Sequence, residues 1–303
     1  MKIKQLIKYW IYRFKWYTAR YINYSSPVHL DIELSTRCNL NCEFCFRQDC
    51  KYEQKDIDVE LAITLLDQAK AINVKSVKFN WRGEATIHSK LLIIFLYAKK
   101  LCLYTMLNTN LALDYGNNLL AKIADIDNLK ISIDSMNKET YEKIRKGADF
   151  LKVISNLRLL DFFRRTETNK REPIVINRRT SELTTESNEQ FICQLNQFGK
   201  FKYDIRPAMP RNQKQIYQDK LKERKRKYCA QPSRRMVVDV DGNVWMCCVS
   251  YNQDKALWLG NVKEKSLKEC WDSSKRALLV QSLKRNIFNN NTCKNCTSGD
   301  AYK

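Results

Sequence analysis

The stretch "STRCNLNCEFCFR", residues 35–47, places three cysteines, Cys38, Cys42 and Cys45, in one short loop. Thiolates at this spacing can surround one inorganic cluster, but three of them leave one iron of a [4Fe–4S] cube without a protein ligand. The apolar segment 29–34, directly before the loop, has the pattern of a buried strand. Parallel sheets gather their functional groups where the strands end. The stretch therefore predicts an iron–sulfur site with one open iron at the carboxyl edge of a sheet.

A zinc site is the alternative interpretation of the same three thiols. Structural zinc takes four ligands, so it needs a further Cys or His close by. Cys50 is available, but it lies five residues beyond Cys45, outside the usual spacing of zinc-binding loops. The pattern favours an iron–sulfur cluster.

Strand-like and helix-like segments alternate from residue 29 onward. The strand patterns cover 29–34, 74–81, 103–110, 128–134, 173–179 and 202–208, and the helical patterns cover 58–72, 89–101, 138–147 and 185–198. Such alternation predicts an α/β fold with a parallel sheet and right-handed crossovers. Six units of this kind amount to a partial (β/α)6 barrel, which we expect over residues 29–210.

Three segments flank this barrel. Residues 1–28 begin with a basic, aromatic stretch without Pro or Gly, which predicts a helix. Its residues Trp10, Phe14 and Tyr17 fall at i, i+4 and i+7, so we expect this stripe to pack on the outside of the barrel; a membrane-surface or nucleic-acid arm is the alternative. Residues 211–228 are basic with few apolar side chains, which predicts a linker helix. We expect residues 229–303 to form a second, smaller unit.

Composition limits the class of protein. Of the 303 residues, 44% are hydrophobic and 29% charged, which is typical of a globular protein. No apolar run approaches the roughly 20 residues of a membrane span, and no secretory signal is visible, so we expect a cytoplasmic protein. The net charge of +21 favours anionic partners but identifies none. Twelve cysteines with C-x2-C-type spacings indicate metal binding rather than disulfides.

The cysteine loop matches the signature C-x3-C-x-aromatic-C, with Phe44 as the aromatic residue. In this it resembles the radical S-adenosylmethionine (SAM) superfamily, and the resemblance covers almost the whole chain. It implies that the three thiolates hold a [4Fe–4S] cluster whose open iron binds the amino and carboxylate groups of SAM, with Phe44 near the adenine. It also implies that reductive cleavage of SAM yields a 5'-deoxyadenosyl radical, which removes a hydrogen atom from a substrate C–H bond.

Two other segments carry the same resemblance. "NWRGEAT", at the end of the second strand pattern, is similar to the family's Gly-Gly-Glu-Pro motif, whose backbone and carboxylate receive the methionine ammonium of SAM. Gly83 and Glu84 match this motif, whereas its first Gly and its Pro are replaced. "SIDSMNKETYEKIRKG" is similar to the family's Ser-x-Asp segment with an Arg thirteen residues after the Ser. By this resemblance Ser132 contacts the ribose of SAM and Arg145 its carboxylate.

The C-terminal unit holds a second set of cysteines. Cys229 and Cys247 flank Gly242 in a C-x12-G-x4-C pattern, and Cys293 and Cys296 form a C-x2-C pair. The Asp-Gly turn predicts a hairpin that returns Cys247 beside Cys229, and four thiolates saturate the irons of one cluster. A zinc tetrathiolate is the alternative that spacing alone leaves open.

This unit is similar to the twitch form of the SPASM domain, and "WLGNVKEKSLKECWDS" resembles that family's Leu-Gly-Asn segment with the helix after it. Full SPASM domains continue with more cysteines beyond the C-x2-C pair, whereas residues 297–303 contain none. The resemblance therefore implies one auxiliary [4Fe–4S] cluster, bound by Cys229, Cys247, Cys293 and Cys296.

The remaining cysteines have simpler interpretations. Cys102, Cys193 and Cys270 lie in apolar surroundings of the sequence, so we expect them to pack in the core. Cys248 follows a predicted cluster ligand, and alternation along a strand would turn it to the opposite face. Because a thiol S–H bond is weaker than most C–H bonds, Cys248 could return a hydrogen atom to a substrate radical. Packing is the interpretation that we favour, and the donor role is the alternative.

Three functions are compatible with these patterns. The first is modification of a ribosomally made peptide by oxidation, cross-linking or epimerisation, since many twitch and SPASM enzymes act on peptides and a basic protein suits an acidic leader. The second is oxidation of a small molecule such as an aminosugar, with the auxiliary cluster accepting an electron. The third is action on a nucleic acid or a lipid-linked envelope substrate, with the basic arm docked on a nucleic acid or an anionic membrane. We rank the peptide first, and each function implies an electron donor such as flavodoxin or ferredoxin.

Overall fold

The computed structural model describes residues 2–50, 52–168, 174–208, 228–250 and 254–296. The strands in these ranges are β1 (His29–Ile32), β2 (Ser76–Lys78), β3 (Tyr104–Thr109), β4 (Asn128–Ser132), β5 (Val175–Thr180), β6 (Lys202–Pro207), β7 (Arg235–Val238), β8 (Asn243–Trp245) and β9 (Trp258–Asn261). The helices are α1 (Lys2–Thr18), α2 (Val59–Ala71), α3 (Leu91–Lys100), α4 (Asn117–Ala124), α5 (Lys138–Ile144), α6 (Phe150–Thr166), α7 (Asn188–Asn196), α9 (Leu267–Asp272), α10 (Ser274–Lys284) and α11 (Asn291–Lys294).

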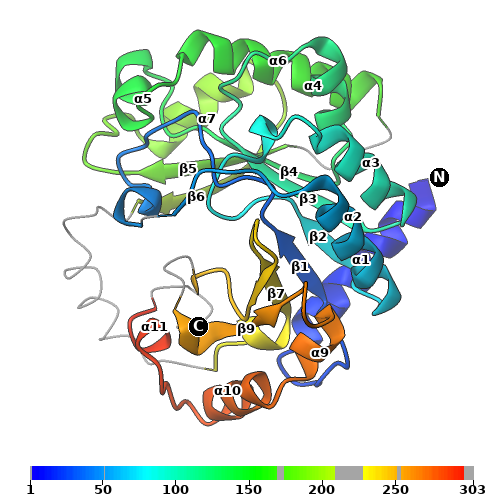
Figure 1. Ribbon diagram of the computed structural model, residues 1–303. Helices are drawn as coiled ribbons and strands as arrows, with labels where there is room; N and C mark the ends of the chain where they lie inside the picture. The colour runs from blue at the N-terminus through cyan, green and yellow to red at the C-terminus, as the bar shows by residue number, and fades with distance from the viewer. Residues whose placement is uncertain (1, 51, 169–173, 209–227, 251–253, 297–303) are drawn as a thin grey trace.

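The described strands form one nine-stranded sheet in the order β6-β5-β4-β3-β2-β1-β7-β8-β9. Strands β1 to β6 are all parallel, with register pairs such as Leu30↔Val77 and Ile131↔Ile176. Helices α2 to α7 cover one side of these six strands, and α1 packs on the amino end of the other side, against Tyr104 and Met106 (Figure 1). The predicted α/β fold, a parallel sheet that forms a partial barrel without closing, is confirmed.

The two faces of the sheet differ in chemistry. The residues that face the helices are apolar and belong to the main core: Leu30, Ile32, Val77, Leu107, Leu129, Ile131 and Ile176. On the opposite face, which we call the inner face, Asp31 lies 2.9 Å from Arg235 and 3.2 Å from Lys78. A parallel strand that was covered on both faces would be apolar throughout. The alternation therefore identifies the inner face as the side that receives polar molecules.

The C-terminal unit continues the same sheet. β7 pairs with β1 in parallel, and β8 and β9 follow as antiparallel strands. Gly242 forms the turn between β7 and β8 with a φ of +86°, a conformation that L side chains rarely adopt. Leu267 N–H donates to Gln68 Oε1 at 2.8 Å, which ties α9 to α2. Pairing between distant strands thus joins the two units that the sequence distinguishes.

Helix α1 packs on the sheet through a different face from the predicted one. Tyr12 stacks on Tyr104 with 5.5 Å between the ring centroids. Trp10, Phe14 and Tyr17, the stripe predicted to pack, are more than half exposed. The prediction was wrong because α1 carries an aromatic stripe on each of two faces, and the 3.6-residue periodicity fits either of them.

Other outcomes concern single segments. Helices α4 and α6 lie where no element was predicted. Cys270 is buried as predicted, whereas Cys102 and Cys193 are exposed, because Cys102 lies beyond the last turn of α3 and Cys193 on the solvent side of α7. The predicted linker helix lies outside the described residues except for residue 228. In the described ranges, no helix is long and apolar enough to cross a membrane.

Candidate active site

The cysteine loop lies at the carboxyl edge of the parallel sheet, between β1 and α2. Two backbone hydrogen bonds join it to the end of α5: Asn41 N–H donates to Lys146 O (2.8 Å), and Glu43 N–H donates to Ile144 O (3.0 Å). Because α5 follows β4, these bonds connect the loop of one barrel unit with that of another. The loop is therefore held in place by the barrel as well as by its own turns.

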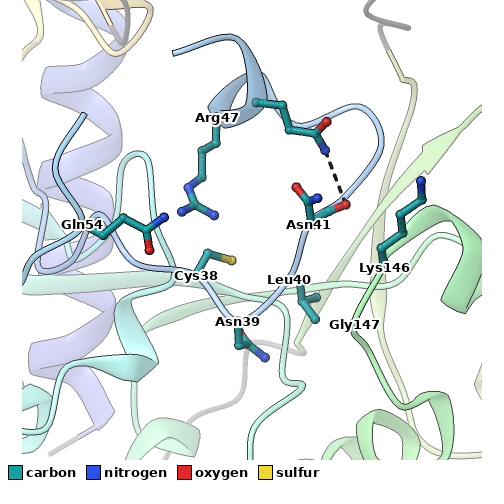
Figure 2. Close-up of a pocket in the computed structure, with 9 residues that line it drawn as sticks. Cys38, Asn39, Leu40, Asn41, Arg47, Gln54, Lys146 and Gly147 are labelled. Carbon is teal, nitrogen blue, oxygen red and sulfur yellow. Dashed lines mark hydrogen bonds between the residues drawn. The ribbon is translucent and has the colours of Figure 1, made fainter. Parts of the chain in front are cut away.

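A cavity of about 490 Å³ opens beside the loop (Figure 2). Its lining consists of Cys38, Asn39, Leu40, Asn41, Arg47, Gln48, Gln54, Lys146 and Gly147. Figure 2 shows the sulfur of Cys38 and the guanidinium of Arg47 directed toward the same space. A cavity of this size, lined mostly by polar groups and bordered by a cysteine, is suited to a small polar ligand.

Hydrogen-bond donors face two sulfurs of the loop. Burial raises the pKa of Cys38 to about 11 and raises the pKa of Cys42 above its usual value, so both are neutral thiols without metal. Asn110 Nδ2 nevertheless lies 3.9 Å from Cys38 Sγ, and Arg145 Nη1 lies 3.8 Å from Cys42 Sγ. Such donors stabilise a sulfur that carries negative charge. The environment of both thiols therefore suits metal ligation better than an uncharged S–H.

Arg145, the predicted carboxylate contact, lies beside the loop. Its Nε is 2.7 Å from Asp134 Oδ2, and its guanidinium lies 5.7 Å from the centre of the Phe44 ring. Burial disfavours the charge of Arg145, but Asp134 and Cys42 outweigh burial and hold its pKa above the ordinary value. A fixed cation thus faces both Cys42 and Phe44. The position is compatible with the predicted contact between Arg145 and SAM, which stays a prediction.

Gly83 and Glu84 brace the start of the cysteine loop from the end of β2. A Cβ atom on Gly83 would lie 2.2 Å from Ser35 O, so only glycine permits this approach. Glu84 N–H donates to Arg37 O (2.8 Å), and the buried Glu84 carboxylate accepts the N–H of Asn110 (2.8 Å). These contacts explain why both residue types are needed here, and the predicted contacts with SAM stay predictions.

Ser132 lies on the inner face, which carries many polar residues, although Tyr104 and Met106, against which α1 packs, also belong to it. Strand pairing places these residues on it: Asp31, Lys78, Asn108, Lys130, Ser132, Asn177, Arg179, Asp204 and Arg206. Lys130 Nζ lies 3.1 Å from Asp204 Oδ2. Ser132 pairs in register with Asn177, whose buried Oδ1 has no hydrogen-bond partner among the residues that the structure describes. The acceptor beside Ser132 is therefore unsatisfied, and it is buried rather than exposed on this face.

Sequence patterns assigned no role to three residues of the site: Asn110, Asp134, which belongs to the Ser-x-Asp segment, and Asn177. Asn110 and Asp134 follow the carboxyl ends of β3 and β4, and Asn177 lies in β5. The signal that could have found the first two is position, since polar residues just beyond parallel strands meet at one edge of a sheet. Asn177 became recognisable only through its register with Ser132.

The predicted auxiliary ligands come from two places in the C-terminal unit. Cys229 and Cys247, on either side of the β7–β8 hairpin, are close enough to interact electrostatically. Cys293 lies in α11, which Thr292 anchors by donating from Oγ1 to Asp254 Oδ2 (2.5 Å) in the segment after Cys247. Binding of all four cysteines to one cluster stays a prediction.

Cys248 lies in a turn beyond β8 rather than on a strand, so the expected alternation of faces does not apply. Its thiol accepts a hydrogen bond from Cys247, and its carbonyl accepts one from Trp81 Nε1 (2.6 Å). The hydrogen bond from Cys247 lowers the pKa of Cys248, burial raises it, and Arg235 lowers it further, which leaves it below the usual range. Cys248 therefore borders the inner face near Arg235.

The cysteines are available as metal ligands. All twelve cysteines are free thiols. Within the part of the chain that the structure describes, no three His, Cys, Asp or Glu side chains converge on a point where one metal ion could bind.

Family models match two parts of the chain. Residues 32–161 match the radical SAM superfamily, and residues 229–297 match SPASM, an iron–sulfur cluster-binding domain. The first range contains the cysteine loop and Arg145, and the second contains the predicted auxiliary ligands. The chain belongs to the radical SAM superfamily and carries a C-terminal SPASM domain. It is a radical SAM enzyme whose cofactors are a [4Fe–4S] cluster with SAM and auxiliary iron–sulfur in the SPASM domain.

Several solved structures share this architecture over most of the chain. SuiB of Streptococcus suis bound to the precursor peptide SuiA has a TM-score of 0.64 and 16% identity, with 94% of this chain and 72% of SuiB covered. BtrN in complex with AdoMet and 2-DOIA has a TM-score of 0.59 and 18% identity, with 90% and 93% covered. For anSMEcpe with bound AdoMet the TM-score is 0.62 and the identity 17%, with 91% and 88% covered. At these identities the similarity shows the fold.

Relatives that were found by sequence match a smaller part of this chain than the solved structures do. A tungsten-containing aldehyde ferredoxin oxidoreductase cofactor-modifying protein of Pyrococcus furiosus is 31% identical over 99 residues, which is 32% of this chain and 28% of the relative. A probable GTP 3',8-cyclase of Pyrococcus abyssi is 30% identical over 132 residues, which is 42% of each. The match spans less than half the length of these relatives, so it supports the family and assigns no activity.

Proposed function

We propose that this radical SAM enzyme modifies a peptide by oxidation, cross-linking or epimerisation. The observation that carries the proposal is the carboxyl half of the inner face, where Asn108, Ser132 and Asn177 lie; the amino end of that face is covered by α1. An extended peptide needs hydrogen-bond partners for its backbone groups, and the inner face offers amide and charged side chains. In this proposal the Asn177 side chain, whose Oδ1 is buried and unused, turns toward the substrate and accepts a peptide N–H beside Ser132.

The charge of the inner face favours an acidic substrate. Cations outnumber acids on or beside this face: Lys78, Lys130, Arg179, Arg206 and Arg235 against Asp31 and Asp204. The whole chain has a net charge of +21. A positive groove with low-dielectric walls attracts acidic segments and raises their local concentration. An acidic leader segment therefore suits this protein.

In this proposal the residues around the loop have separate roles. Cys38, Cys42 and Cys45 hold the cluster, Gly83 and Glu84 keep the loop in its place beside the methionine ammonium, Arg145 holds the SAM carboxylate, Ser132 contacts the ribose, and Phe44 borders the adenine. When bound, the reduced cluster and SAM supply a radical that removes hydrogen from a substrate C–H bond. An electron donor such as flavodoxin or ferredoxin provides the reducing electron.

Oxidation of a small molecule such as an aminosugar is the second candidate. The observation that favours it is size, since the alignment covers 93% of BtrN but only 72% of SuiB. The C-terminal unit also has the four predicted ligands of one auxiliary cluster, Cys229, Cys247, Cys293 and Cys296. In such an oxidation the 5'-deoxyadenosyl radical would remove one hydrogen atom, and the substrate radical would then lose a proton and pass one electron to the auxiliary cluster, so one acceptor is sufficient.

Deuterium tracing distinguishes the two candidates. The reconstituted enzyme is incubated anaerobically with SAM, a reductant and either deuterated acidic peptides or deuterated aminosugars. Deuterium in 5'-deoxyadenosine from peptides alone supports the proposal, and transfer from the sugar alone supports the second candidate. Asn177→Ala should lower peptide turnover by about tenfold through the loss of one hydrogen bond. The control Asn117→Ala, at an exposed position on α4, should retain turnover.

A further inference from the structure

Helix α1 presents an apolar face to solvent. Trp10 and Phe14 are each 65% exposed, Tyr17 is 57% exposed, and Ile7 and Ile11 are 51% and 41% exposed. The chain just beyond the helix adds exposed Tyr21 and Ile22. A stripe of large apolar side chains at this spacing on one helix exceeds the scattered apolar residues that ordinary surfaces carry. We call these seven residues the α1 outer face.

The exposure of this face does not result from a poorly packed helix. The opposite face of α1 is held by Tyr12, which stacks on Tyr104, and by Trp16, which contacts His29 edge-on at 5.9 Å. The guanidinium of Arg235 also lies 5.0 Å from the centre of the Trp16 ring. The α1 outer face is thus displayed outward by a helix that is fixed on the sheet.

Positive charges are frequent in the sequence around the α1 outer face. Residues 1–30 contain six cations, Lys2, Lys4, Lys8, Arg13, Lys15 and Arg20, and no Asp or Glu. Arg13 lies beside the apolar stripe, with its guanidinium 4.5 Å from the centre of the Tyr17 ring and hydrogen-bonded to the Tyr17 hydroxyl. This arrangement, an apolar stripe with cations at its margin, complements a surface that is anionic outside and apolar beneath.

We propose that the α1 outer face binds an anionic lipid bilayer, with α1 lying in the plane of the interface. Trp10 and Phe14 enter the boundary between headgroups and acyl chains, and the cations meet lipid phosphates. A nucleic acid fits less well, because phosphate recognition places cations at the centre of a surface, where Ile7 and Ile11 lie here. A second copy also fits less well, because two such helices would bring their cations together.

This orientation determines where the active site faces. Tyr104 and His29, which α1 contacts, are the first residues of β3 and β1, so α1 lies at the amino edge of the sheet. The cysteine loop follows the carboxyl end of β1, at the opposite edge. Figure 1 shows α1 on one side of the strands and the loop between β1 and α2 on the other. A membrane-bound enzyme therefore turns its cluster loop toward water, and its substrate arrives from the aqueous side.

Vesicle binding by the full-length reconstituted protein tests the proposal. Sedimentation is measured with vesicles of phosphatidylcholine plus phosphatidylglycerol and with vesicles of phosphatidylcholine alone. We expect binding to the anionic vesicles, weakened by added salt, and a loss of about tenfold or more in affinity for the double variant Trp10→Ser/Phe14→Ser. The matched control is Leu151→Ser/Phe162→Ser, which removes side chains of similar exposure, 64% and 51%, from α6. The control should bind like the unaltered protein.

Any of the following results of the vesicle-binding experiment would overturn the proposal. Equal binding to both vesicle types removes the role of charge, and an equal loss in the α6 variant removes the role of α1. Labelled single-stranded DNA is measured in parallel, and a loss of DNA binding in the α1 variant with vesicle binding unchanged assigns the face to a nucleic acid. Self-association that the α1 variant abolishes assigns it to a second copy. SAM cleavage, measured without vesicles, reports whether each variant is folded.

Discussion

Arg145 Nη1 lies 3.8 Å from Cys42 Sγ, although the two residues are 103 positions apart in the chain. The contact joins the end of α5 to the loop after β1, and Asp134 holds the same guanidinium from the other side at 2.7 Å. A fixed cation at a cysteine sulfur serves both a negatively charged cluster and an anionic cosubstrate group. The fold therefore places a fixed guanidinium beside Cys42 before any cofactor binds.

We expect Arg145→Lys to weaken SAM binding by about tenfold or more, because a lysine keeps the charge but loses the planar fork that reaches two groups at once. The measurement is SAM affinity by equilibrium dialysis, on protein with equal iron content. The control is Arg165→Lys, an exposed arginine that pairs with Asp161 on α6. Unaltered SAM affinity in Arg145→Lys would contradict the role assigned to the guanidinium.

A second prediction concerns the cysteine loop. Reconstituted protein should bind about eight irons, as two [4Fe–4S] clusters, one for each set of ligands. Replacement of Cys38, Cys42 and Cys45 with Ala should reduce the iron to about half and abolish cleavage of SAM to 5'-deoxyadenosine. Replacement of Cys102 and Cys193, both exposed, is the control and should leave iron and cleavage unchanged. Cleavage by the triple variant would disprove the ligand assignment.

The auxiliary site leads to a third prediction. Four thiolates saturate a cube, so added SAM should alter the electron paramagnetic resonance signal of only the cluster in the cysteine loop. Cys293→Ala should lower the thermal stability of the C-terminal unit, since cluster binding and folding are coupled there. A shift of the auxiliary signal with SAM would require an open iron and would refute the four-cysteine count.

The pH dependence of stability yields a fourth prediction, centred on His29. Burial lowers the pKa of His29 below 6.5, so the unfolded chain binds more protons than the folded protein as the pH falls below that value. Stability should therefore decrease with acidification below about pH 6.5, by at most about 1.4 kcal/mol per pH unit for one group. Asp31 does not contribute to the change of stability in this pH range, because Lys78 and Arg235 outweigh the effect of burial on its pKa and keep the carboxylate ionised.

His29→Gln isolates this contribution, since Gln can keep a hydrogen bond to Ser76 without titrating. Burial raises the pKa values of Glu33 and Glu84, so these two groups increase the stability of the folded protein as the pH falls. The effect of His29 is therefore measured as the difference in unfolding free energy between His29→Gln and the unaltered protein at each pH. Urea midpoints measured between about pH 5 and 6.5 should fall less steeply in His29→Gln. Parallel curves for the two proteins would show that His29 is not the group responsible.

Local patterns predicted the parallel sheet because each strand is short and apolar on its helix-facing side, with a helical segment following. They did not predict that β7 pairs with β1, because that pairing joins residues about two hundred positions apart, such as His29 and Arg235. The cysteine loop was recognisable because its ligands are neighbours in sequence. Asn110 and Asp134 were not, since only the fold brings them to the same edge.

The packed face of α1 illustrates a different limit. Tyr12 and Trp16 are spaced as regularly as Trp10 and Phe14, so periodicity marks two candidate faces and cannot rank them. The choice depends on which stripe fits Tyr104 and His29, and Tyr104 is contributed by β3, far along the chain from α1. Helix faces with two aromatic stripes are thus resolved by tertiary contacts.

The last prediction concerns Cys248 and distinguishes epimerisation from dehydrogenation. An epimerase must quench its substrate radical with a hydrogen atom from the side opposite to the abstraction, and Cys248 borders the inner face near Arg235. The hydrogen bond from Cys247 that lowers the pKa of Cys248 requires the Cys247 proton, which is absent when Cys247 binds metal, so Cys248 then keeps its own S–H. In heavy water this thiol would deliver deuterium to the product.

If the enzyme is a dehydrogenase, the substrate radical instead loses a proton and an electron, and no hydrogen donor is needed. Cys248→Ala removes the donor and leaves all seven predicted ligands, so an epimerase should lose solvent deuterium in its product and stall after abstraction. The products of the unaltered protein and of Cys248→Ala are compared by mass spectrometry. If both proteins give the same product and neither product contains solvent deuterium, Cys248 is a packing residue.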